Sequence, residues 1–264
     1  MNGKSLSFFF LFLGTAALLF AFVKEGGAIM TLLAPTALII IIGGTIAATG
    51  LSFPADELRV LPGALKASFN FKRKSLAHQI IYFKEISAKT RAEGLLAFDK
   101  ELEKITDPFL KKGLRMVVDG FDSSAVRSIL EQDLELAGVR HKMGAEILES
   151  AGGYSPTMGV VGTVMGLINV LSRLDEPGKL GGAIAMAFIA TLYGVAFANL
   201  WWLPLGAKMR AAHKQEVYEK QFIIEAVLLI QEGANTFLLI ETLKGFLERE
   251  ERVIFDKLNE KKSP

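Results

Sequence analysis

Residues 155–174 read SPTMGVVGTVMGLINVLSRL, and this stretch decides the fold. All of it up to Ser172 belongs to a run between Glu149 and Arg173 that contains no acidic or basic residue. An α-helix needs about 20 consecutive, mainly apolar residues to cross the hydrocarbon core of a bilayer. The run is long enough, so it predicts a transmembrane helix.

The same stretch carries three glycines and a hydroxyl near its middle. Gly159, Gly162 and Gly166 are spaced i, i+3 and i+7, which places them on one face of a helix. The spacing of Gly162 and Gly166 also matches the small-xxx-small pattern that lets membrane helices approach closely. Thr163 lies beside that face, where a membrane threonine usually bonds the carbonyl four residues earlier. The pattern therefore predicts a packed neighbouring helix and leaves open whether the hydroxyl also serves a polar path.

Three further runs lack charged residues. They lie between residues 4 and 24, 25 and 56, and 179 and 208. We predict four transmembrane helices, at about 5–23, 30–51, 155–173 and 182–203. The hydrophobic share of 51% and the mean hydropathy of +0.36 disfavour a soluble protein with four buried helices. A cleaved signal peptide at the N-terminus is disfavoured because its apolar run is too long and a second span follows at once.

Basic residues set the expected orientation. Lys and Arg residues cluster near the span ends that border the two long polar segments, at positions 59, 66, 72–74, 140, 142, 208, 210 and 214. The positive-inside rule then places both long segments and both termini in the cytoplasm. The short connections, whose only basic residues are Lys24, Arg173 and Lys179, face outward.

The fold class expected from this layout is an all-α membrane protein. Residues 1–53 hold the first two spans, 54–150 a helical cytoplasmic domain, 151–206 the last two spans, and 207–264 a helical tail. Asp56, Asp107-Pro108 and Asp122-Ser123 are typical of helix starts, and Gly233-Ala234-Asn235 of a helix break. The apolar run 222–230 is too short to span and contains Glu225, so we expect it to pack on other cytoplasmic helices.

Motifs for catalysis are missing from the sequence. The chain has no cysteine, no phosphate-binding loop, no dinucleotide fingerprint and no zinc-protease motif. Its net charge of +2 gives no support for nucleic-acid binding. We therefore expect no enzyme activity, no cofactor and no fixed metal.

The predicted spans also lack ionisable residues, which usually mark ion-coupled membrane proteins. An ion-moving function would thus need a titratable group from another polypeptide. Thr163 and Thr191 are expected within about one helical turn of the same depth, and Asn199 adds an amide to the fourth span. Hydroxyl and backbone oxygens of such a seam could bind a hard cation such as Na⁺ transiently, and water there could carry protons.

The arrangement resembles the flagellar stator subunits of the MotA/PomA/MotP family over nearly the whole chain. The stretch RAEGLLAFD (91–99) is similar to the family's R-x-x-G-L-L-x-L-E, and DPFLKKGLRMVVDG (107–120) to its D-x-F-L-K-x-G-L-x-x-x-x-D-G. YSPTMGVVGT (154–163) resembles the start of its third span, and ATLYG (190–194) its fourth. The sequence departs from the family where Asp99 replaces Glu and where Thr236 and Phe237 follow Asn235 in place of proline.

The resemblance implies a function. Five copies would surround two copies of a single-span MotB/PomB-type partner that carries an intramembrane aspartate, and ion passage would drive the flagellar rotor. It implies contacts of Arg91 and Asp99, with Lys89 and Glu93 beside them, to the rotor switch protein FliG. It implies coupling roles for Pro156 and Pro204. It implies an ion pathway lined by Thr163, Thr191, Gly159, Gly162, Gly166, Tyr193 and Asn199.

The coupling ion and the class of machine have alternatives. The hydroxyl at Thr163, where many proton-driven members carry alanine, favours sodium over protons. A TolQ/ExbB-type energiser of envelope processes is the nearest alternative, but that family typically has three spans. A solitary pore or transporter and a passive scaffold are further alternatives, disfavoured by the absence of an inverted repeat and by the matched cytoplasmic stretches.

Overall fold

The protein is described here by a computed structural model that covers residues 3–70, 73–94, 102–172, 174–175 and 177–261. Within these ranges the chain forms helices and turns and no strand, which confirms the all-α prediction. It divides into two compact units. The spanning unit comprises Met1–Phe71 and Arg140–His213, and the charged unit comprises Lys72–Val139 and Lys214–Pro264.

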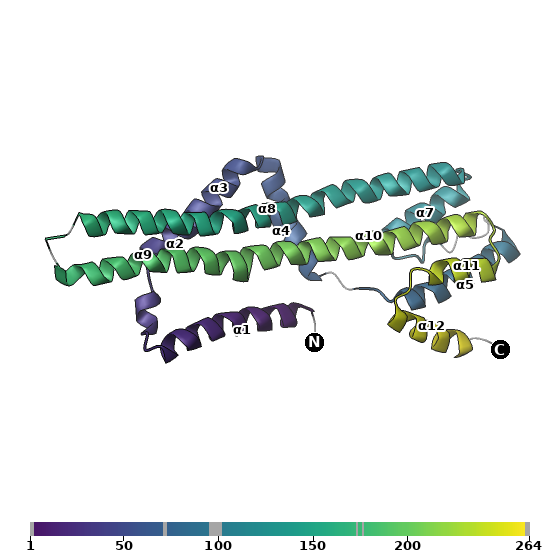
Figure 1. The fold of residues 1–264 in the computed structure, drawn as a ribbon. Helices are drawn as coiled ribbons and strands as arrows, with labels where there is room; N and C mark the ends of the chain where they lie inside the picture. The colour runs from purple at the N-terminus through teal and green to yellow at the C-terminus, as the bar shows by residue number, and fades with distance from the viewer. Residues whose placement is uncertain (1–2, 71–72, 95–101, 173, 176, 262–264) are drawn as a thin grey trace. The chain divides into compact units, whose positions relative to one another are not determined.

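Helices build both units (Figure 1). The spanning unit contains α1 (Gly3–Lys24), η1 (Ile29–Leu32), α2 (Pro35–Leu38), η2 (Ile39–Gly43), α3 (Gly44–Ser52), α4 (Ala55–Asn70), α9 (Pro177–Phe197) and η4 (Ala198–Trp202). The charged unit contains α5 (Leu76–Glu93), α7 (Pro108–Val118), α11 (Thr236–Lys244) and α12 (Arg249–Lys261). Two long helices, α8 (Ser123–Leu171) and α10 (Leu203–Gln231), contribute residues to both units.

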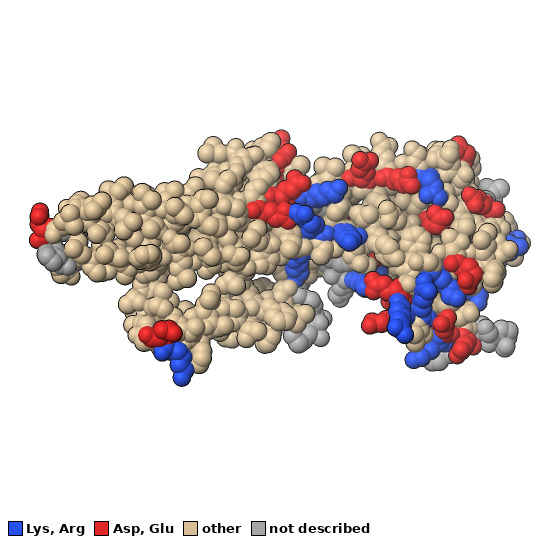
Figure 2. All heavy atoms as spheres, viewed as in Figure 1, with Lys and Arg blue, Asp and Glu red and all other residues tan. Residues whose placement is uncertain are grey.

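Four segments are long and apolar enough to cross a membrane, as the sequence predicts. The first, α1, exposes large apolar side chains on all sides, such as Phe12 and Phe20. A helix that is apolar all round and yet exposed is stable in lipid and unstable in water. On the face in Figure 2, Lys, Arg, Asp and Glu side chains lie at the ends of the spanning helices and leave the surface between them uncharged.

The second span is not one regular α-helix, and the third span is not a separate helix. The second follows one path from Ile29 to Ser52 but passes through a 3-10 turn and a π turn before α3. Pro35, at the first position of α2, has no N–H with which to continue the preceding turn. The third span is the C-terminal part of α8, which has 49 residues. Pro156 therefore lies inside a helix and does not begin one.

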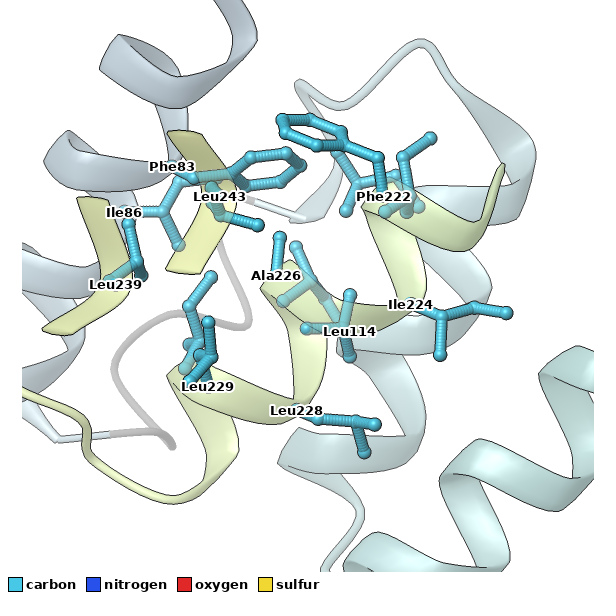
Figure 3. Close-up of a cluster of buried hydrophobic side chains, with 14 of the residues drawn as sticks. Phe83, Ile86, Leu114, Phe222, Ile224, Ala226, Leu228, Leu229, Leu239 and Leu243 are labelled. Carbon is cyan, nitrogen blue, oxygen red and sulfur yellow. The ribbon is translucent and has the colours of Figure 1, made fainter. Parts of the chain in front are cut away.

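The charged unit has an apolar core of its own. Residues 222–230 of α10 are buried in it except for Glu225, which confirms that this run packs on other helices. Phe222 lies 5.7 Å from Phe83 of α5 and 5.6 Å from Phe246 between ring centroids. In Figure 3 the same cluster receives Leu239 and Leu243 from α11.

Polar contacts fix the ends of these helices. Asp107 caps α7, because its carboxylate accepts from the backbone N–H groups of Phe109 at 3.0 Å and Leu110 at 3.3 Å. Lys74 donates to the other carboxylate oxygen at 2.7 Å. Burial favours the neutral form of Asp107, but these hydrogen bonds outweigh it and hold the pKa of the carboxyl below its ordinary value.

The N-terminus of α5 is capped from another helix. Glu251 of α12 accepts from the backbone N–H of Ala77 and from the hydroxyl of Ser75, both at 2.9 Å. The predicted helix start at Asp122 is likewise confirmed, since its carboxylate accepts from Ala125 N–H at 2.9 Å. So is the break before α11, where Asn235 accepts from Leu238 N–H at 2.7 Å.

Candidate functional site

The glycine face of α8 packs against α9 at backbone distance. A Cβ added at Gly159 would lie 3.1 Å from the carbonyl oxygen of Ala190 and 3.3 Å from the Cα of Gly194. One added at Gly166 would lie 2.7 Å from the Cβ of Ala187. A third at Gly162 would meet the Cβ of Ala190 at 2.8 Å. The packed neighbour predicted from the glycine spacing is therefore α9, which runs antiparallel to α8.

This close approach brings the two threonines into contact. The hydroxyl of Thr163 lies 3.1 Å from the carbonyl oxygen of Gly159, in its own helix, and 3.0 Å from that of Ala187 in α9. It is also hydrogen-bonded to the hydroxyl of Thr191. Both expectations for Thr163 are thus confirmed, since it bonds the carbonyl four residues earlier and lies at the depth of Thr191.

The oxygens around Thr163 outnumber the available protons. Two carbonyl oxygens and two hydroxyls meet there, and each hydroxyl carries a single proton. At least two lone-pair positions therefore have no donor from this group. A cluster of neutral oxygens with spare lone pairs suits a hard cation or a hydrogen-bonded water.

Ser155 makes a second polar contact between the same helices. Its side chain is fully buried, and its hydroxyl donates to the carbonyl oxygen of Gly194 at 2.9 Å. Sequence reasoning did not select this residue. Its one signal is a polar side chain inside a charge-free run, and that signal does not say which helix it bonds.

Two prolines lie along the same pair of spans. Pro156 is inside α8, where the missing N–H leaves the carbonyl of Gly152 without its usual helical donor. Pro204 is the second residue of α10, and α10 directly follows the π turn η4. A π turn widens the helix and gives a proline ring room beside the preceding turn. Both positions are therefore places where a spanning helix can bend.

Comparison with known proteins gives three consistent matches. The MotA/TolQ/ExbB proton channel family model matches residues 101–221. The chain is 37% identical to motility protein A of Bacillus subtilis over 92% of this chain and 90% of that protein. It is 32% identical to the chemotaxis protein PomA of Vibrio alginolyticus over 87% of this chain and 90% of that protein.

A solved structure agrees with the sequence matches. The flagellar MotAB stator complex from Bacillus subtilis contains a chain that aligns with a TM-score of 0.87 at 36% identity, over 95% of this chain and 98% of that chain. The chain belongs to the MotA/PomA family of flagellar stator subunits. Both the whole-length fold and the local motifs support this membership.

Two other residues that the family resemblance suggested for the ion pathway, Tyr193 and Asn199, form hydrogen bonds elsewhere. The hydroxyl of Tyr193 donates to the carbonyl oxygen of Leu32, so it fastens the start of the second span to α9. The amide of Asn199 donates to the carbonyl oxygen of Val195 in its own segment at 2.9 Å and is exposed. Neither side chain contacts Thr163 or Thr191 through these hydrogen bonds.

The residues that the family resemblance places at the rotor are only partly described. Lys89 and Arg91 are exposed on the last turns of α5. Asp99 and the side chain of Glu93 lie outside the described residues. The part of the chain that the structure describes contains no group of three His, Cys, Asp or Glu side chains that could hold a metal ion.

Proposed function

We propose that this chain is the membrane subunit of an ion-driven flagellar stator in the bacterial inner membrane, with both termini in the cytoplasm. Its partner is a single-span protein of the MotB/PomB type, five copies of this chain around two of the partner. The relatives named motility protein A and PomA, and the MotAB complex of similar fold, support this assignment. It includes no catalysis and no bound cofactor.

The observation that carries the proposal is the oxygen cluster between α8 and α9. It offers neutral ligands and no charge, because the charge-free runs between Glu149 and Arg173 and between Lys179 and Lys208 supply none. A neutral site binds a cation weakly and releases it readily. An acidic group from the partner would complete the charge balance, as intramembrane ion carriers require.

We further propose sodium as the coupling ion. Sodium is a hard cation that prefers oxygen ligands, and Thr163 brings two carbonyl oxygens and the Thr191 hydroxyl within reach of one point. A proton would need only a chain of water molecules. The charged positions Arg91 and Asp99, with Lys89 and Glu93, are assigned to contact with the rotor protein FliG.

The test is swimming speed against sodium concentration at fixed pH and ionic strength. The cells lack their own stators and express this chain with its cognate partner. We expect speed to rise with sodium and to be lost when potassium replaces it. Speed that ignores sodium and is abolished by a protonophore would contradict the sodium assignment. No motility with both proteins in the membrane would favour the TolQ/ExbB-type alternative.

Replacing Thr163 by alanine tests the oxygen cluster directly. We expect the sodium concentration for half-maximal speed to rise roughly ten-fold, because a polar contact to a charged group contributes about 1.5 kcal/mol or more. Thr157→Ala is the matched control, since the Thr157 hydroxyl donates to the carbonyl of Tyr154 in its own helix at 2.7 Å. An equal rise of the half-maximal sodium concentration in both variants would contradict a specific role of Thr163.

A further inference from the structure

The buried hydroxyl of Ser155 has an unusual partner. In a membrane helix a serine normally donates to the carbonyl three or four residues earlier in the same helix. Ser155 instead donates across to the carbonyl oxygen of Gly194 in α9 at 2.9 Å, and its side chain is completely buried. The contact joins the same two helices as the hydrogen bonds of Thr163, at a second level of their interface.

The contact lies where the two backbones are closest. A Cβ added at Gly194 would lie 2.7 Å from the carbonyl oxygen of Ser155 and 2.9 Å from the Cα of Gly159. Real Cβ atoms essentially never come this near, so the separation of α8 and α9 here is fixed by glycine and by the hydrogen bond together.

The position of the contact along the helices gives it a function. Ser155 precedes Pro156, where α8 lacks one backbone hydrogen bond and bends most easily. Thr163 lies eight residues further on, about 12 Å along the helix. A change of bend at Pro156 would therefore move Thr163 relative to Thr191 unless α8 is held to α9 near the bend. Ser155 supplies that hold.

We propose that Ser155 is a positioning residue of the ion pathway: its hydrogen bond to Gly194 sets the separation of α8 and α9 at which Thr163 and Thr191 meet. It does not touch the ion. The effect on ion use rests on the function proposed above, whereas the effect on helix separation does not.

Cysteine cross-linking measures the separation without any need for motility. The chain has no cysteine of its own, so Thr163→Cys with Thr191→Cys gives a single reporting pair. Disulfide formation requires close Cβ atoms and is sensitive to small displacements. The pair is placed in the full chain, expressed with its partner, and oxidised briefly in native membranes. Free thiols are counted by a maleimide mass tag on a gel.

We expect Ser155→Ala to lower the cross-linked fraction about three-fold at early times. That change corresponds to ~0.6 kcal/mol, the average strength of an interhelical hydrogen bond in a membrane. Ser172→Ala is the control, because the Ser172 hydroxyl donates to the carbonyl of Asn169 nearby in the chain at 2.9 Å. Equal cross-linking in the Ser155 variant and its parent would overturn the proposal.

Ion dependence then separates a positioning role from loss of stability. In otherwise unmodified chains, Ser155→Ala should raise the half-maximal concentration of the driving ion by about three-fold, with unchanged membrane level and partner binding. In a Thr163→Ala background the same change should have no further effect, because the hydroxyl that Ser155 positions is already gone. An additive effect, or weaker cross-linking with unchanged ion dependence, would overturn the link to the ion pathway.

A failure of the stator assignment would look different. Cells that express the unmodified chain with its partner would then show no sodium-driven or proton-driven motility. Cross-linking would still test whether Ser155 sets the separation of α8 and α9. Loss of the Ser155 effect in cells that swim normally would overturn only the positioning role.

Discussion

At the scale of single residues, the absence of a side chain matters as much as its presence. Gly194 lets the carbonyl oxygen of Ser155 and the Cα of Gly159 approach α9. Thr163 can reach the carbonyl of Ala187 in the facing helix only because Gly159 and Gly166 on its own helix leave room. Each hydroxyl could have bonded its own helix alone, so the contacts across the seam depend on these small neighbours.

Gly194→Ala is expected to separate the two helices. The new Cβ would meet backbone atoms at 2.7 and 2.9 Å, which no rotamer change can relieve. Overpacking of this kind lowers the free energy of unfolding by about 1–3 kcal/mol. The thermal stability of the purified complex and the cross-linking of positions 163 and 191 should both fall.

The control for this change is Gly63→Ala in α4, where a Cβ would meet no other atom within 4 Å. It should leave stability unchanged or raise it by up to about 1 kcal/mol, the helix preference of alanine over glycine. Unaltered cross-linking in the Gly194 variant would contradict the backbone contact between α8 and α9.

At the scale of helices, caps decide where the elements begin. Asp107 caps α7 with one carboxylate oxygen and pairs with Lys74 through the other. The N-terminus of α5 relies instead on Glu251, a residue of α12. The start of α7 is thus fixed locally, and the start of α5 depends on a helix far along the chain.

Asp107→Ala should destabilise the protein by about 1 kcal/mol or more, since it removes the cap. Asp107→Asn keeps an oxygen for the cap and loses only the ion pair, so its loss should be smaller, about 0–1 kcal/mol. Thermal unfolding of the full chain in detergent at neutral pH measures both changes. A larger loss for Asn than for Ala would contradict the capping role.

The pH dependence of the same site follows from its lowered pKa. The pKa of the Asp107 carboxyl is lower in the folded state than in the unfolded chain, where an aspartate has a pKa of about 3.9. The stabilisation is therefore complete above that pH and is lost as the pH falls through the folded-state pKa. The difference in stability between the native protein and the Asn variant should shrink over that range, and a constant difference would contradict this account.

At the scale of the whole molecule, the two units are stabilised in different solvents. The charged unit buries an apolar core around Phe222. The spanning unit leaves large apolar side chains exposed along its helices. Insertion of the spans depends on their hydropathy in lipid, whereas folding of the charged unit depends on packing in water.

Phe222→Ala should therefore unfold the charged unit without preventing membrane insertion. The side chain is fully buried, and removing a buried phenylalanine destabilises a core by about 3–5 kcal/mol. We expect the variant in the membrane fraction but with residues 72–139 and 214–264 open to limited proteolysis. Phe237→Ala, at a side chain 75% exposed, should change stability by less than about 0.5 kcal/mol. Loss of the Phe222 variant from the membrane fraction would show that membrane insertion of the spans depends on folding of the charged unit.

Much of this protein was readable from its sequence because the signals are local. Charge-free runs specify the four spans, since the free energy of inserting a segment into lipid depends on the residues of that segment itself. Asp107 and Asp122 specify helix starts, since a cap bonds backbone groups two or three residues away, and Gly233-Ala234-Asn235 specifies a helix break. The spacing of Gly159, Gly162 and Gly166 specifies the face on which a neighbour packs.

The tertiary structure alone decided which atoms meet across that face. Helical periodicity gives the direction of a side chain but not how far one helix is displaced along another. Ser155 could have bonded its own helix, Tyr193 could have joined the threonines, and Asn199 could have faced the seam. Close packing of Gly159 on Gly194 fixes one displacement of α8 against α9, and that displacement places Thr163 against Thr191 and Ser155 against the Gly194 carbonyl. The sequence determined which segments enter the membrane, and the backbone contact between two of them determined the site.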